Sequence, residues 1–119
     1  MAKALLFNLT DQKRMKILFL LMQHGVVAVE VAEKDFGRSL GSLLGKGEYP
    51  AAPEALTPFF DEMMVLDGLD AQQFHGLLNG MQALQAPVTY KAVTTEHNLS
   101  WTPARLHREL VAEHAAMHN

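Results

Sequence analysis

Four short apolar segments alternate along the chain with segments of helical pattern, and this alternation constrains the fold more than any other feature. The short segments are rich in β-branched and aromatic residues and have turn formers on their flanks. They predict strands at Ala4–Phe7, Val26–Val31, Met63–Leu66 and Val88–Val93. Because their apolar character is nearly continuous, they are typical of strands that are buried on both faces, as in a parallel sheet.

The ends of the first two helices are marked by capping residues. Thr10 is a suitable N-cap for the first helix, and Gly25 is a suitable residue just beyond its end. A second helix is predicted over about Asp35–Leu44, ending before Gly45, although Gly37 and Gly41 lie inside it and each costs about 1 kcal/mol relative to alanine.

The third and fourth helices carry clearer signals. The third is capped by Asp70, is ended by Pro87, and has one apolar stripe at Phe74, Leu77, Leu78, Met81 and Leu84. The fourth begins at Thr102 as N-cap and Pro103 as first helical residue, and Trp101 is expected to pack on Leu106 across this start.

The element order β-α-β-α-β-α-β-α predicts one α/β domain that spans residues 1–119. We expect a four-stranded, mostly parallel sheet with the flavodoxin-like order 2-1-3-4 and helices on both faces. A long loop with glycines and prolines, at about 45–60, precedes the third strand and is expected to be either functional or partly disordered. Phe59 and Phe60 are expected to re-enter the core after it.

The two halves of the chain also show a faint repeat. With an offset of 60 residues, five residues recur with the same identity: Leu6, Leu9, Gln12, Leu18 and Ala32 match Leu66, Leu69, Gln72, Leu78 and Ala92. The matching order of elements makes an ancestral duplication a reasonable hypothesis.

Composition excludes several classes of function. The chain has no cysteine, which removes disulfides, thiolate catalysis and cysteine metal sites. No apolar run is long enough for a membrane span, and the Met-Ala-Lys start does not have the form of a secretory signal, so a cytoplasmic protein without membrane association is expected. The net charge is −3, and the only basic cluster, Lys13, Arg14 and Lys16, is interpreted as a solvated helix face, so nucleic-acid binding is not expected.

Three stretches together resemble a small family of uncharacterised bacterial proteins that is known only as a domain of unknown function. They are residues 5–10 (Leu-Leu-Phe-Asn-Leu-Thr), residues 64–70 (Met-Val-Leu-Asp-Gly-Leu-Asp), and the tail with Lys91-Ala92-Val93-Thr94, Trp101-Thr102 and Glu113-His114. Asn8 stands where glycine is typical of that family. The resemblance implies an α/β fold; it implies no reaction and no catalytic residues.

Ligands of open parallel sheets bind beyond the carboxyl ends of the strands, near the switch in strand order. The residues that leave those ends are the candidates for a site. Ligand binding is assigned to Asn8, Thr10, Gly68, Thr94 and Asn98, and acid–base chemistry to Asp67, Asp70 and His97. A purely structural interpretation also stands, in which Asp70 is a helix cap and Asp67 is a turn former.

The last helix carries His107, His114 and His118 on one side. His114 and His118 are four residues apart and are candidates to share a metal ion, but two ligands do not close a zinc site. His107 lies two turns from His114, too far to share that ion. No cofactor is predicted, and the alternative is a half-buried helix flank or an oligomer interface.

Two functions are consistent with these features. The first is a non-catalytic module that binds a ligand or a protein partner; the alternative is a small enzyme or group-transfer domain that acts on a polar or anionic small molecule at the strand ends. The run Ile17–Met22 is apolar on almost every side, so either the long loop or a second subunit is expected to cover it. A homodimer through this helix or through the last helix is therefore a candidate assembly.

Overall fold

The computed structural model describes residues 1–47, 49–50 and 58–117. Within them the chain forms β1 (Lys3–Phe7), α1 (Asp11–Gln23), β2 (Val27–Glu30), η1 (Glu33–Asp35), α2 (Leu40–Leu43), β3 (Met63–Asp67), α3 (Ala71–Ala83), β4 (Tyr90–Val93) and α4 (Pro103–Met117). None of the helices in these ranges is long and apolar enough to cross a membrane. Much of the predicted loop at 45–60 lies outside the described residues.

Three of the four helix predictions are confirmed at their N-termini, and the second is wrong. In place of one helix over about residues 35–44, the chain forms the short η1 and α2. Ser39 between them has extended backbone angles and its side chain accepts a hydrogen bond from the Ser42 N–H at 3.2 Å, so it caps a new helix. Gly37 lies in the turn between the two pieces, where it avoids the cost of a glycine inside a helix.

The start of α4 follows the prediction closely. The Arg105 N–H donates to the Thr102 side chain at 3.2 Å, which makes Thr102 the N-cap. Trp101 and Leu106 belong to the same apolar cluster, as expected for residues on either side of a helix start. The Arg105 guanidinium lies 4.4 Å from the Trp101 ring centroid and covers the outer side of the indole.

The sheet has the predicted order β2-β1-β3-β4, but it is mixed. β1 and β2 are parallel and β3 and β4 are parallel, whereas the central pair β1 and β3 is antiparallel, with Lys3 opposite Asp67 and Phe7 opposite Met63. The predicted flavodoxin-like strand order is confirmed, whereas the prediction of a mostly parallel sheet is wrong. Each parallel pair is joined by one crossover helix, but the long connection from β2 to β3 is not a single crossover and brings the chain back in the opposite direction.

The two halves of the chain are structural repeats. α1 and α3 span residues 11–23 and 71–83, so both ends differ by 60. Positive φ angles recur with the same offset, at Asn8 and Gly68 (59° and 75°) and at Gly25 and Gln85 (69° and 54°). After these turns the offset becomes 63, because β2 begins at Val27 and β4 at Tyr90. The match of Ala32 with Ala92 is therefore not structurally equivalent, whereas the other four identities are.

A pseudo-two-fold axis relates the repeats. In the antiparallel central pair Leu5 lies opposite Val65, which is its own equivalent at an offset of 60. Ala4 lies opposite Leu66, and Leu6 lies opposite Met64, as the same symmetry requires. The axis thus passes through the middle of the sheet, and equivalent ends of the two halves lie at opposite ends of the molecule.

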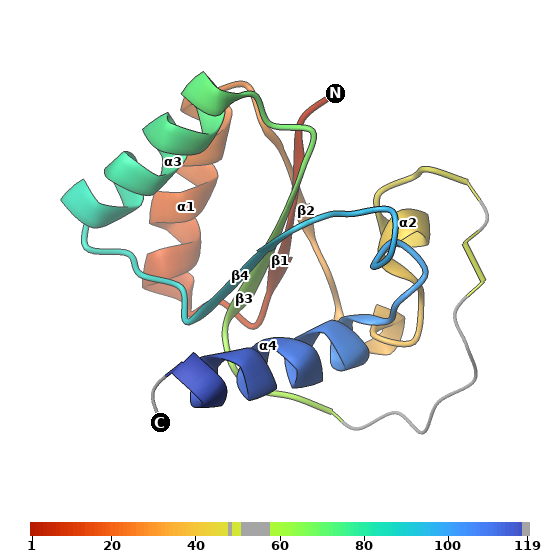
Figure 1. The fold of residues 1–119 in the computed structure, drawn as a ribbon. Helices are drawn as coiled ribbons and strands as arrows, with labels where there is room; N and C mark the ends of the chain where they lie inside the picture. Colours follow the sequence, from red (N-terminus) through yellow and green to blue (C-terminus); the bar gives the residue numbers. More distant parts are fainter. Residues whose placement is uncertain (48, 51–57, 118–119) are drawn as a thin grey trace.

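Helices lie on both faces of the sheet, and alternate strand residues point to each face. Figure 1 shows α1 and α3 side by side on one face, with α2 and α4 on the other. Ala4, Leu6, Met64 and Leu66 join the α1–α3 layer in one apolar cluster. The residues between them join a second cluster with η1, α2 and α4: Leu5, Phe7, Met63 and Val65.

The α1–α3 contact depends on two glycines one turn apart on α3. A Cβ atom added at Gly80 would lie 2.5 Å from Leu20 Cδ2, and one added at Gly76 would lie 2.5 Å from the His24 ring. A Cβ at either position would force the facing side chain to shift, so the glycines let the two helices approach closely.

On the outer edge of the first half, Arg14 of α1 reaches Glu30 of β2. The guanidinium makes two hydrogen bonds to the carboxylate, one of them from Nη2 at 3.0 Å. The bond from Arg14 holds the pKa of the Glu30 carboxyl below its ordinary value. Both side chains are partly exposed, so this ion pair contributes little to stability but closes the gap between α1 and the sheet edge.

Candidate functional site

The predicted site at the strand ends does not assemble, because β1 and β3 are antiparallel. Asn8 follows the end of β1, whereas Asp67 at the end of β3 lies opposite Lys3 at the start of β1. Asn8 and Thr10 are therefore at one end of the sheet and Asp67, Gly68 and Asp70 at the other. The prediction of one shared rim is wrong for this reason.

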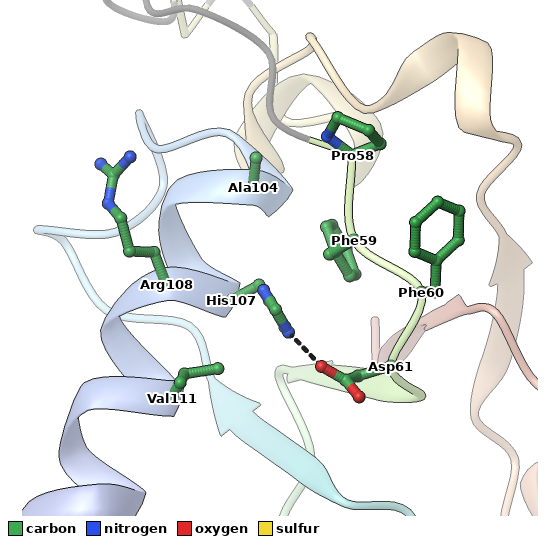
Figure 2. A pocket seen from close by; sticks show the side chains of 8 residues that line it. All are labelled: Pro58, Phe59, Phe60, Asp61, Ala104, His107, Arg108 and Val111. Atoms are coloured by element: carbon green, nitrogen blue, oxygen red, sulfur yellow. Dashed lines mark hydrogen bonds and ion pairs between the residues drawn. The ribbon is translucent and has the colours of Figure 1, made fainter.

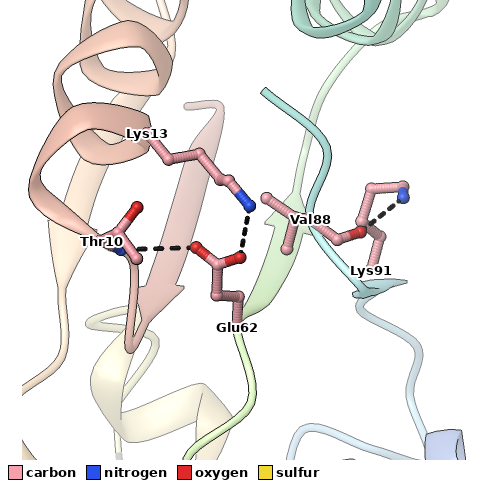
Figure 3. A network of polar contacts seen from close by, with 5 residues as sticks. All are labelled: Thr10, Lys13, Glu62, Val88 and Lys91. Atoms are coloured by element: carbon pink, nitrogen blue, oxygen red, sulfur yellow. Dashed lines mark hydrogen bonds and ion pairs between the residues drawn. The ribbon is translucent and has the colours of Figure 1, made fainter. Parts of the chain in front are cut away.

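Asn8 and Thr10 make their contacts with the segment before β3. The Asn8 Nδ2 group donates to the carbonyl oxygens of Phe59 and Asp61 at 3.0 and 3.1 Å. The Thr10 N–H faces Glu62 Oε2 at 3.4 Å, and Lys13 Nζ lies 2.5 Å from Glu62 Oε1 (Figure 3). The end of β1 thus holds residues 59–62 in place through side-chain and backbone hydrogen bonds.

The structure does bring Asp67, Thr94 and Asn98 together at the opposite end. The buried Asp67 carboxylate accepts from Thr94 Oγ1 at 2.5 Å and lies 3.2 Å from Lys46 Nζ. Asn98 accepts from the Thr95 N–H at 2.8 Å and donates to the Val93 carbonyl at 3.2 Å. These groups thus have partners inside the chain and stabilise the turn after β4. His97 in the same turn is exposed.

Asp70 is the N-cap of α3. Its carboxylate accepts from the Gln73 N–H at 2.7 Å, and the Gln73 side chain accepts from the Asp70 N–H at 3.0 Å. This reciprocal pair is a capping box. Gly68, with φ of 75°, makes the turn that leads into it.

Replacement of Asp70 by alanine is expected to lower the free energy of unfolding by about 1 kcal/mol, because the Gln73 N–H loses its acceptor. Asp70→Asn keeps an oxygen acceptor and is expected to retain most of that stability. Urea denaturation of both variants measures the difference. Equal stability of the alanine variant and the parent chain would argue against the capping role.

A pocket of about 460 Å³ lies at the other end, between residues 58–61 and α4. Figure 2 shows its two walls: Pro58, Phe59, Phe60 and Asp61 on one side, and Ala104, His107, Arg108 and Val111 of α4 on the other. Phe59 is buried in the core behind the pocket, whereas Phe60 is 80% exposed. The prediction that both phenylalanines re-enter the core is correct for Phe59 and wrong for Phe60.

His107 is the central residue of this pocket. Its ring stacks on Phe59 with centroids 4.4 Å apart and meets the Tyr90 ring edge-on at 5.4 Å. Its Nε2–H donates to Asp61 Oδ2 at 2.8 Å. The His107 side chain is 16% exposed and the Asp61 side chain 55% exposed, so the imidazole is held by the core and the carboxylate faces solvent.

The metal candidates of the last helix do not form a site within the described residues. His114 lies 5.9 Å from the Tyr90 ring, and His118 is outside the described ranges. No group of three or more histidine, aspartate or glutamate residues that could hold a metal ion is present in the part of the chain that the structure describes.

Comparison with known families adds one finding. Residues 62–117 match the family model of a domain of unknown function, DUF3783. This confirms the resemblance to such a family for the segment from β3 through α4. No curated protein and no solved structure matches the chain.

The pocket lies at the boundary of the segment that matches DUF3783. The matched segment contains the α4 wall of the pocket, with His107, Arg108 and Val111, and it begins directly after Asp61 of the other wall. By the internal repeat, β1, α1 and β2 have the same architecture as the β3-α3-β4 part of the DUF3783 segment.

Sequence patterns do not indicate Asp61, Phe60 or Arg108 as residues of this pocket. They place His107 on a half-buried helix flank or in an oligomer interface, and no spacing rule links it to Asp61, which lies 46 residues earlier. The available signal was an aromatic pair followed by a carboxylate directly before a strand, in a chain whose last helix carries several histidines.

Proposed function

We propose that the chain is a non-catalytic ligand-binding module whose site is the pocket between residues 58–61 and α4. The ligand class that fits is a small molecule with a cationic group and a flat apolar portion. The observation that carries this proposal is that the exposed Asp61 carboxylate and the exposed Phe60 ring line the same pocket. A carboxylate and an aromatic face together bind a cation by charge and by cation–π attraction.

The orientation of the His107–Asp61 pair favours binding over catalysis. In an acid–base dyad the carboxylate is the buried, orienting group and the imidazole faces the substrate. Here the imidazole is packed between Phe59 and Tyr90, and the carboxylate is the more exposed partner. His107 therefore serves to position Asp61, and Asp61 is the group that a ligand reaches.

Phenethylamine is a suitable probe, and hydrocinnamate is its matched control, with the same ring and a carboxylate in place of the ammonium. We expect phenethylamine to bind with a Kd of about millimolar and to shift the backbone NMR signals of Phe60, Asp61 and His107. Asp61→Asn and Phe60→Ser are each expected to weaken binding roughly fivefold, about 1 kcal/mol. Equal binding of the two probes, or no change in either variant, would count against the proposal.

The alternative is an enzyme that uses His107 as a base, or one that uses Asp67, Asp70 and His97 at the β3–β4 end. Only the 2.8 Å contact between His107 and Asp61 favours it. Turnover of polar esters or phosphate esters by the full chain, lost in His107→Gln or Asp67→Asn, would support an enzyme and overturn the non-catalytic proposal.

We also propose that two copies of the chain associate through α1. Ile17, Leu20 and Leu21 are buried against the sheet and α3, but Met15, Phe19 and Met22 on the outer face are 63, 54 and 74% exposed. The equivalent positions of α3, at an offset of 60, are the polar His75, Asn79 and Gln82. The comparison within one chain indicates that the apolar face is particular to α1.

Sedimentation or light scattering over a range of concentrations tests this association. We expect Phe19→Lys to shift the chain toward the monomer and Asn79→Lys, on the equivalent face of α3, to leave the oligomeric state unchanged. A parent chain that is monomeric at high concentration would overturn the proposed dimer.

A further inference from the structure

Two further hollows lie between α3 and the edge strand β4, and they share no lining residue with the pocket at α4. Their volumes are about 420 and 260 Å³, and both are lined by Leu78 and Lys91. Met81 and Pro87 line the larger hollow, and Phe74 and Val93 line the smaller one. Together they form one apolar groove beside the edge of the sheet, called here the α3–β4 groove.

The first half of the chain contains the equivalent groove in a closed form. Arg14 of α1 corresponds to Phe74 at an offset of 60, and Glu30 of β2 corresponds to Val93 at an offset of 63. In the first half these positions form the ion pair that bridges α1 to the sheet edge. In the second half they are two apolar side chains, with Val93 53% exposed. The repeat therefore shows how this fold closes the groove and that the second half leaves it open.

Among the described residues, Lys91 is the one charged residue that lines the groove. Its Nζ donates to the Val88 carbonyl at 2.9 Å (Figure 3), which leaves two N–H donors for another group. No carboxylate among the described residues forms an ion pair with it. An apolar groove with one such ammonium is complementary to an apolar segment that carries one carboxylate.

β4 also presents backbone donors at this edge. Tyr90 and Thr94 donate their N–H groups to Glu62 and Leu66, on the β3 side. Because N–H directions alternate along a strand, those of Lys91 and Val93 point away from β3, and β4 is the last strand of the sheet. The side chains of Lys91 and Val93 lie on the α3 side and line the groove.

We propose that the α3–β4 groove binds an extended segment of an acidic partner protein, which adds a strand to β4. The Lys91 N–H and carbonyl and the Val93 N–H pair with the partner's backbone, whereas the Val93 carbonyl keeps its bond from Asn98. The partner's apolar side chains enter the groove beside Phe74 and Leu78, and one carboxylate contacts the Lys91 ammonium. This site is separate from the pocket at α4 and does not depend on the ligand proposed there.

The charge of the groove favours an acidic partner segment over a second copy of the chain as its occupant. Two copies paired through β4 would place two Lys91 ammonium groups along one short edge, and no acidic residue in the described part of the chain lines either groove. Like charges across paired strands destabilise the pairing. A bound fatty acid would fill the apolar groove and pair its carboxylate with Lys91, but it would leave the N–H groups on the β4 edge without partners.

A display library of short random peptides, selected on the full-length chain, provides the test. We expect enriched peptides that alternate apolar residues with an acidic residue. Their binding is expected to slow hydrogen exchange of the Lys91 and Val93 amides. Lys91→Gln in the chain, or amidation of the acidic residue in the peptide, is expected to weaken binding several-fold.

The chain supplies its own matched control. Phe74→Arg with Val93→Glu installs the closing ion pair of the first half and is expected to weaken peptide binding roughly tenfold or more. Arg14→Phe with Glu30→Val opens the equivalent groove of the other half, where Ala28 stands in place of Lys91. This variant is therefore expected to bind the acidic peptides no more tightly than the parent chain. The proposal is overturned if no peptide is enriched, if the peptides bind the Phe74→Arg, Val93→Glu chain equally well, or if decanoate binds the groove while peptides do not.

Discussion

Phe7→Ala is expected to lower the free energy of unfolding by about 3–5 kcal/mol. Phe7 is fully buried at the end of β1, and its ring meets Phe36 edge-on at 5.6 Å and lies 5.9 Å from Phe59. Removal of the ring leaves a cavity between the sheet and the layer that holds η1 and α4, which the neighbouring side chains fill only partly. The loss is a large share of the stability of an ordinary domain.

Guanidinium denaturation measures this effect, and Phe60→Ala is the matched control. Phe60 is the same residue type but largely exposed, so its replacement is expected to change stability by about 0.5 kcal/mol or less. The Phe7 variant has a second readout, because Phe59 is stacked between Phe36 and His107 and forms one wall of the pocket. Weaker phenethylamine binding is therefore expected as well. A stability loss no larger than that of Phe60→Ala would show that the Phe7 side chain is not packed as described.

Gly80→Val is expected to destabilise the chain by about 1–3 kcal/mol through overpacking of the α1–α3 contact. A Cβ at Gly80 would lie 2.5 and 3.3 Å from the two methyl carbons of Leu20, which is itself buried and cannot turn toward solvent. Gly80→Ala is expected to be much milder, because one methyl group requires only a shift of Leu20, and alanine favours the helix by about 1 kcal/mol.

Thermal or urea unfolding of a double-mutant cycle isolates the contact. Leu20→Ala removes the side chain that a residue at position 80 would meet, so the double variant is expected to be more stable than the sum of the two single changes predicts. Asn79→Val, on the outer face of the same helix, controls for the lower helix propensity of valine. Strictly additive effects would indicate that Leu20 and Gly80 are not in contact.

The candidate site shows which functional residues can be predicted from sequence patterns and which cannot. Asp70 and Thr102 were predictable as caps because a cap depends on residues within one helical turn. The pocket was not, because it joins Asp61 and His107 through the packing of Phe59 against α4. Asn8 was selected as a ligand contact because it follows a strand, but its amide holds the backbone of Phe59 and Asp61.

Local pattern determined the strands, most of the helices and the capping residues, because these depend on hydrophobic periodicity and on hydrogen bonds between near neighbours. The offset of 60 residues between the two halves was also present in the sequence. Only the tertiary structure decided the direction of β3 against β1. A strand that is buried on both faces has the same apolar composition whether its neighbour is parallel or antiparallel, and the long connection before Met63 permits either. Because β1 and β3 are antiparallel, Asp67 and Asn8 lie at opposite ends of the sheet, and the residues that follow β1 and β3 belong to two separate candidate sites.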